Sequence, residues 1–112
     1  MKLVEAIIQP FKLEDVKHAL SQIDVKGLTV SEVQGFGRQK GRSMSYRGAS
    51  STPQFIPKLK LQVIVTDAQL PQVEEAIRRT ARTGNVGDGK IFVISLDQVS
   101  RIRTGEKGDA AV

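Results

Sequence analysis

LKLQVIVTDAQLPQVEEAIRRTA, residues 59–81, changes its apolar period from two to between three and four within a few positions. Its first part alternates apolar and polar side chains over most of the run, as a half-buried strand does, with the apolar positions at Leu59, Leu61, Val63 and Val65. Pro71 then fits the first turn of a helix. An apolar stripe at helical spacing follows on Leu70, Val73, Ala76, Ile77 and Ala81. The sequence therefore predicts a strand followed directly by a helix.

The outer surface of that helix carries opposite charges four residues apart. Glu74 precedes Arg78 by four positions, and Glu75 precedes Arg79 by the same number. Side chains at this spacing are neighbours on a helix, so we expect two ion pairs.

The N-terminal half repeats the same order of elements. Residues 2–9, KLVEAIIQ, form a β-branched run closed by Pro10 and predict a strand. A helical stripe follows, with Glu14 and Asp15 in the first turn, where the helix dipole favours negative charge; its apolar members are Leu13, Val16, Ala19, Leu20 and Ile23. Gly27 ends this unit, and residues 28–36 return to strand character. Residues 90–96 are the closing strand of the second unit, and residues 99–103 suggest a short extra one.

The order β-α-β, long loop, β-α-β predicts one ferredoxin-like α+β sandwich over residues 1–112. The loop at about 37–55 is longer than the 12–15 residues or so that a compact domain tolerates without a functional reason or disorder. Two helices cover only one face of four strands. We expect residues of the 59–65 strand to make the other face too apolar for water, so that copies of the chain self-associate.

Composition limits the class of protein. The 112 residues are 39% hydrophobic and 26% charged, as in one globular domain. There is no cysteine, which excludes disulfides and thiolate metal sites and favours a reducing compartment, the cytoplasm. The N-terminal apolar run is too short for a signal peptide, and no stretch approaches the roughly 18 apolar residues of a membrane span. We expect a cytoplasmic protein.

A net charge of +5 suggests an anionic partner: nucleic acid, an acidic surface or a phosphorylated small molecule. Aromatic residues make up only 4% of the chain, and the phenylalanines are scattered rather than clustered for base stacking. A small phosphorylated ligand is therefore favoured over nucleic acid.

Residues 82–90, RTGNVGDGK, are a candidate phosphate-binding turn. Gly84, Gly89 and Lys90 match the letters GxxxxGK, but Ile91 replaces the Ser or Thr that would bind magnesium. The turn also leaves a helix and enters a strand, the reverse of a P-loop. We reject the P-loop, yet glycines can still turn backbone N–H groups toward an anion beside a lysine. The alternative is an ordinary connection with a helix C-cap at Gly84.

Two further segments combine glycine or extended backbone with basic residues. If residues 101–103, RIR, are extended, Arg101 and Arg103 project from the same side of the chain toward a common phosphate. Alternatively they are surface arginines with little energetic role. Residues 35–42, GFGRQKGR, place three basic residues just after two glycines at the start of the long loop. Three such segments favour an anion site.

The search for catalytic groups finds none. His18 lies beside Lys17 on the first helix and is expected to be solvated. Adjacent acids such as Glu74 and Glu75 point to different sides of their helix. No triad, metal-ligand cluster or convergent carboxylate pair is visible, so a binding protein is favoured over an enzyme.

These segments together resemble the PII nitrogen-regulatory signal-transduction proteins. The resemblance covers essentially the whole chain and is carried by EAIIQPFKLEDVK from residue 5, GFGRQKG from 35, YRGA from 46, RTGNVGDGKIFV from 82 and RIRTGE from 101. It implies a homotrimer that binds ATP or ADP between neighbours and 2-oxoglutarate beside magnesium-ATP. It also implies a switch, not a catalyst, whose long loop docks onto an ammonium transporter or a nitrogen-assimilation enzyme. Any membrane contact would then be indirect, through a transporter.

The resemblance implies roles for individual residues, all of them present here. The phosphate contacts fall on Arg38, Gly87, Gly89, Lys90, Arg101 and Arg103. The residues around the nucleotide base are Ile7, Thr29, Gly35 and Ile64. Gln62 lies near the ribose, Asp88 belongs to the glycine turn, and Gly37 is a further nucleotide-binding residue. For 2-oxoglutarate they are Gln39, Lys58 and Gly87, with Gln39 also a magnesium ligand through its amide oxygen. Magnesium commonly leans on substrate phosphates, so no carboxylate cage is required. Arg47 is the implied docking residue of the long loop.

Two departures from the family pattern matter. Gln62 stands where the family usually has glutamate near the ribose and Lys90, which we expect to retune nucleotide preference without abolishing binding. In YRGASST, residues 46–52, Ser51 replaces the tyrosine that is uridylylated in many bacterial members, and Ala49 replaces the serine phosphorylated in cyanobacterial ones. Neither modification transfers to its usual position. Ser50 also replaces an acid, which argues against docking to a partner such as N-acetylglutamate kinase.

Three alternatives stay open from the sequence. A paralogue specialised for inorganic carbon or another transporter would account for the changes at positions 50, 51 and 62. A basic ferredoxin-like module that binds RNA would use the same positive charge, and its affinity would fall steeply with salt. An enzyme acting on ATP would need a base to position water, which the sequence does not offer.

Overall fold

A computed structural model of the protein describes residues 1–37 and 54–112. The four strands are β1 (Lys2–Ile8), β2 (Thr29–Gly37), β3 (Gln54–Val65) and β4 (Lys90–Ser95). The two α-helices are α1 (Leu13–Gln22) and α2 (Leu70–Ala81), and the two short 3-10 helices are η1 (Pro10–Lys12) and η3 (Gly108–Ala111). The sheet is antiparallel in the order β2-β3-β1-β4, which is the predicted ferredoxin-like α+β fold.

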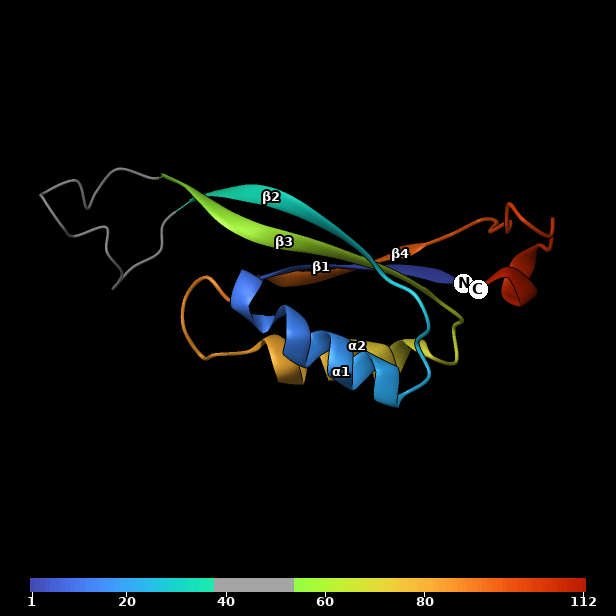
Figure 1. The fold of residues 1–112 in the computed structure, drawn as a ribbon, viewed down its shortest axis with the longest axis horizontal. Coiled ribbons are helices and arrows are strands. Elements are labelled where there is room, and N and C mark those ends of the chain that lie inside the picture. Colours follow the sequence, from blue (N-terminus) through green and yellow to red (C-terminus); the bar gives the residue numbers. More distant parts are fainter. Residues whose placement is uncertain (38–53) are drawn as a thin grey trace, which may run out of the picture.

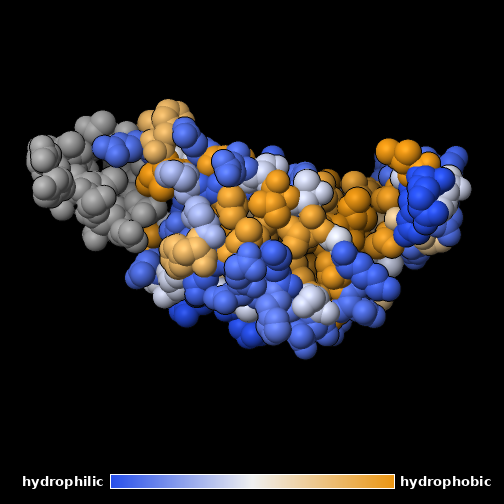
Figure 2. Space-filling view, viewed as in Figure 1, coloured by the Kyte–Doolittle hydropathy of each residue, from blue (hydrophilic) through white to orange (hydrophobic). Residues whose placement is uncertain are grey.

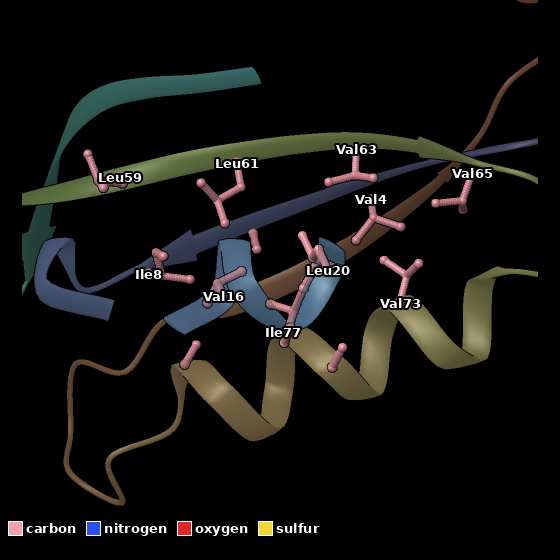
Figure 3. Close-up of a cluster of buried hydrophobic side chains, with 14 residues drawn as sticks. Val4, Ile8, Val16, Leu20, Leu59, Leu61, Val63, Val65, Val73 and Ile77 are labelled. Carbon is pink, nitrogen blue, oxygen red and sulfur yellow. The ribbon is translucent and has the colours of Figure 1, made fainter. Parts of the chain in front are cut away.

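Both helices lie against one face of the sheet (Figure 1). The alternation in β3 predicts this packing, because Leu59, Leu61, Val63 and Val65 all point into the core between the sheet and the helices (Figure 3). Val4 and Ile8 of β1 join them from the same face of the sheet, and Val16, Leu20, Val73 and Ile77 meet them from the helices. Polar side chains cover the outer surface of the helical layer, and apolar ones gather in a band above it (Figure 2).

The uncovered face of the sheet differs from the prediction. The apolar residues of β3 at odd positions face the helices, so Leu59–Val65 supplies only Lys60, Gln62 and Ile64 to the other face. Apolar area there comes instead from Ile64, Phe92 and Ile94, which are 42–44% exposed and lie in register beside Leu3 and Glu5. The apolar residues of the uncovered face therefore come mainly from β4, and not from the 59–65 segment as predicted.

Strand β3 begins at Gln54, five residues earlier than the alternation predicts. Gly37 pairs with Gln54, and the rings of Phe36 and Phe55 meet at a centroid distance of 4.9 Å. Pro57 is tolerated because β1 pairing stops at Leu59, so the missing N–H faces the free edge of β3. The first and last positions of the predicted 37–55 loop therefore belong to strands.

Several smaller predictions are confirmed and two are wrong. Glu14 and Asp15 lie in the first turn of α1, and Pro71 lies in the first turn of α2. The predicted i,i+4 ion pairs on α2, Glu74–Arg78 and Glu75–Arg79, are not formed. Arg78 instead makes one i,i+3 pair, contacting both carboxylate oxygens of Glu75 at 3.0 and 2.9 Å. The predicted extra strand at 99–103 is reduced to a single bridge between Ser100 and Lys107. No helix within 1–37 or 54–112 is long and apolar enough to cross a membrane.

Candidate functional site

The connection between α2 and β4 folds around the side chain of Asp88. Its carboxylate accepts hydrogen bonds from the backbone N–H groups of Thr83 and Gly84, both at 2.8 Å, and from the Thr83 hydroxyl. The same hydroxyl accepts the N–H of Asn85 at 3.1 Å. Burial raises the pKa of Asp88, but these hydrogen bonds, together with the charge of Arg82, outweigh burial and hold the pKa below its usual value. The turn is therefore held by a charged carboxylate.

Gly84 is not the cap of α2. The helix ends at Ala81, and Arg82 is already extended, so Gly84 lies inside the connection with φ +92°. Its positive φ serves the turn around Asp88, and the C-cap alternative for this glycine is excluded.

Lys58, on β3, connects the sheet to the 82–90 turn. Its side chain is buried, and its ammonium donates a hydrogen bond to the carbonyl of Gly87. Gly35 on β2 lies over the stem of Lys58, because a Cβ built there would be 3.7 Å from Lys58 Cγ. The structure thus brings together Gly35, Lys58 and Gly87.

Gly89 lies against β1 so closely that no other residue fits. A Cβ built on Gly89 would lie 1.7 Å from the carbonyl oxygen of Ile7, and its φ is +107°. The close approach places Lys90, the first residue of β4, opposite Ile7. Ile7, Asp88, Gly89 and Lys90 line one open pocket of about 420 Å³, together with residues near the end of α2 that include Arg78 and Arg82.

A second pocket collects three of the predicted base-site residues. Thr29, Gln62 and Ile64 line an open pocket of about 620 Å³ that shares no lining residue with the first. Thr29 and Gln62 are paired across β2 and β3, and Gln62 Nε2 donates to Glu5 Oε2 at 2.8 Å. Ala111 and Val112 form another part of the wall.

The two C-terminal arginines lie far from the 82–90 turn. Residues 101–104 form a turn instead of an extended segment, so the condition for Arg101 and Arg103 to share one side is not met. Arg101 pairs with Glu106 at 3.0 Å, and the backbones of these residues also hydrogen-bond. Arg103 is exposed. In Figure 1 the C-terminal segment and the 82–90 turn lie at opposite ends of β4.

The predicted site residues therefore form two groups within the chain. Gly35, Lys58, Ile7 and residues 87–90 lie in or beside the turn, and Thr29, Gln62 and Ile64 line the separate pocket. Gly37 ends β2. Arg38, Gln39 and Arg47 lie outside the described residues, as do Ala49, Ser50 and Ser51.

Sequence reasoning missed three partner residues. Thr83 braces Asp88, Glu5 holds the amide of Gln62, and Glu106 holds Arg101. The cross-strand register would have placed Glu5 beside Gln62, because β1 and β3 pair in antiparallel fashion. No periodic signal marks Thr83 or Glu106.

The described residues offer no candidate for catalysis. His18 is exposed on α1, and no group of three or more His, Cys, Asp or Glu within 1–37 and 54–112 could hold a metal ion. Within these ranges, the groups suited to contact an anion are backbone N–H groups of glycines and basic side chains.

Comparison with known proteins gives one consistent family. A family model described as nitrogen regulatory protein P-II matches residues 1–106. The chain is 56% identical to the nitrogen regulatory protein GlnK of Escherichia coli K12 and 54% identical to the nitrogen regulatory protein P-II of Pasteurella multocida Pm70. It is 53% identical to the nitrogen regulatory protein P-II of Azospirillum brasilense. Each of these alignments runs over 112 residues and covers 100% of both chains.

Proposed function

This chain belongs to the P-II family of nitrogen regulatory proteins, and from that premise we propose that it is a homotrimeric sensor of ATP, ADP and 2-oxoglutarate. Its long loop then docks on a target in nitrogen metabolism, either an ammonium transporter or an assimilation enzyme. The observation that carries the proposal is the separation of the implied nucleotide site within one chain. The 82–90 turn and the C-terminal segment with Arg101 and Arg103 lie at opposite ends of β4, and Thr29, Gln62 and Ile64 line a pocket of their own.

That division supports assembly because neither group is a complete nucleotide site. The turn at 87–90 offers glycine backbone and Lys90 to phosphates but has neither Arg101 nor Arg103 nearby. A second copy can supply those arginines to the turn. The half-exposed Ile64, Phe92 and Ile94 give copies an apolar surface to bury against one another.

The residues at the 82–90 turn suit a polyphosphate. Gly89 is exposed and has no side chain, so a ligand can approach its backbone closely. Lys90 is exposed and adds positive charge. Arg38 is the further phosphate contact that the family implies.

The surroundings of Lys58 suit a dicarboxylate. Its buried ammonium already meets the carbonyl oxygen of Gly87, so a carboxylate at this place would gain a charge-assisted hydrogen bond. Magnesium, which binds ATP phosphates readily, would be held in part by the amide oxygen of Gln39. When bound, the ion links the phosphates to the acid and offsets their charge.

Control of the loop by covalent tags is not part of the proposal. Ser51 and Ala49 replace the residues that carry those tags in relatives, so ligand load alone sets the docking state. Arg47 is the docking residue that we assign to the loop.

Calorimetry and mass determination test the proposal together. We expect ATP to bind without 2-oxoglutarate, 2-oxoglutarate to bind only with magnesium and ATP, and light scattering to give the mass of three chains. Arg103→Ala should weaken both ligands. Arg79→Ala, on the exposed face of α2, removes the same charge and should leave binding unchanged. A protein without nucleotide heat, or a folded monomer, would contradict the proposal.

A further inference from the structure

An acid lies inside the turn that is proposed to hold phosphates. Asp88 stands between Gly87 and Gly89, two residues before Lys90. A carboxylate at this place repels phosphate oxygens by Coulomb's law, and its hydrogen bonds keep its pKa low enough for it to remain charged. The acid therefore opposes anion binding unless its geometry contributes something else.

The contacts of Asp88 are directed back along the chain. Both carboxylate oxygens are used, one by the Thr83 hydroxyl and the other by the N–H groups of Thr83 and Gly84. The Thr83 hydroxyl, which donates to Asp88, also accepts the N–H of Asn85, so it connects residues 83, 85 and 88. Three donors meet the charge from within residues 83–88.

The remaining part of the turn is fixed from outside. Lys58 holds the carbonyl of Gly87, and Ile7 limits where Gly89 can lie. These two contacts act at Gly87 and Gly89, not at the start of the turn. Asp88 supplies a third support there, because its carboxylate binds residues 83–84, and none of these hydrogen bonds involves another element of the fold.

We propose that Asp88 and Thr83 are positioning residues of the phosphate turn, in which the Asp88 carboxylate shapes the backbone and does not itself contact the ligand. The inference rests on the proposed nucleotide function. It goes beyond that function by giving Thr83 a role and by making Asp88 a residue that positions the backbone, not one that contacts the ligand.

The sign of one substitution separates this role from a purely electrostatic one. Asp88→Asn removes a negative charge near the ligand, which by charge alone strengthens anion binding. The amide NH2 of asparagine cannot accept an N–H or O–H, so one of the two accepting groups is lost and the backbone is released. If positioning dominates, the neutral side chain weakens binding.

The experiment measures ATP and ADP affinity by calorimetry for the wild type and four variants. Asp88→Asn and Thr83→Val should each weaken both nucleotides by roughly tenfold or more, as expected when a charge-assisted hydrogen bond is lost. Thr83→Ser keeps the hydroxyl and should bind like the wild type. Asp97→Asn, at an exposed acid beyond β4, controls for the change in net charge. Thr83→Val keeps the charge of Asp88 and carries the test if Asp88→Asn does not fold.

Amide hydrogen exchange of the ligand-free proteins gives a second readout that needs no nucleotide. Exchange at the hydrogen-bonded amides of residues 83–85 should be faster in Asp88→Asn and Thr83→Val and unchanged in Thr83→Ser. Unaltered or stronger ATP binding by Asp88→Asn, or unaltered exchange, overturns the positioning role. If the wild type binds neither ATP nor ADP, the proposed function fails. The exchange measurement then still decides whether Asp88 and Thr83 hold the backbone of the turn.

Discussion

Replacing Gly89 by alanine tests the close approach of this glycine to β1. The added methyl carbon would lie 1.7 Å from the carbonyl oxygen of Ile7 and 2.8 Å from its carbonyl carbon. Both are backbone atoms of β1, so no side-chain rotation relieves the contact. β1 and β4 must separate where Ile7 pairs with Lys90.

The cost has three parts. A residue with a Cβ held at a sparsely populated positive φ costs about 1–3 kcal/mol. Losing a ladder hydrogen bond adds about 1 kcal/mol, and the backbone shift caused by overpacking adds about 1–3 kcal/mol. Gly84→Ala has the first part only, since its φ is +92° and its nearest neighbour is the Arg82 side chain at 3.8 Å. We expect about 2 kcal/mol for Gly84→Ala and about 4 kcal/mol or more for Gly89→Ala.

Urea unfolding measures the difference between the two variants. All proteins are compared at one protomer concentration, because the stability of an oligomer depends on it. With a slope of about 1–3 kcal/mol per molar urea, the Gly89→Ala midpoint should fall about 1 M below that of Gly84→Ala. Equal midpoints would show that β1 yields easily and would refute the close-packing argument.

Three further predictions concern contacts away from Gly89. Glu106→Gln frees the Arg101 guanidinium, and because this half-exposed pair is worth at most about 1 kcal/mol, ATP affinity measured by calorimetry should rise no more than about fivefold. A double-mutant cycle of Phe36→Ala and Phe55→Ala should give a coupling of about 0.5–1 kcal/mol in urea unfolding; zero coupling contradicts the ring contact. The hydrogen bond and charge of the N-terminal amine hold the pKa of Asp67 below its usual value, so the pair stabilises the fold above that usual value and the stabilisation is lost as pH falls through the folded-state pKa. Asp67→Asn should therefore lose less stability on acidification than the wild type, measured by urea unfolding at several pH values. An unchanged acid profile counts against the pair.

The sequence predicts the elements well where a period is repeated. The alternation at Leu59–Val65 and the stripe of α2 both give the buried face correctly, because burial of every second or of every third to fourth residue is a local rule. The extent of β3 is not predicted, since it depends on Gly37 meeting Gln54 across the sheet. The prediction that residues 59–65 make the uncovered face apolar is wrong for a related reason. An alternating strand gives its apolar residues to one face of the sheet only, and here that face packs against the helices.

The candidate site is predicted only as a set of separate segments. Glycines and bases at 82–90 indicate the turn, but its internal support comes from Thr83 and Asp88, which no periodic rule connects. The pairing of Arg101 with Glu106 likewise requires a turn that reverses the chain at 101–104. Contacts of this kind depend on the full backbone path, and a pattern of residue types does not contain it.

The length of β4 limits how a site containing both Lys90 and Arg103 can form. Lys90 begins this six-residue strand, which spans about 20 Å, and the C-terminal turn follows beyond its other end. Bringing Arg103 to Lys90 within one protomer would require β4 to leave the sheet and break its pairing with β1. If both residues bind one nucleotide, they must come from different copies, and nucleotide then stabilises the assembly by mass action. A monomer whose nucleotide affinity still depended on Arg103 would be incompatible with this geometry.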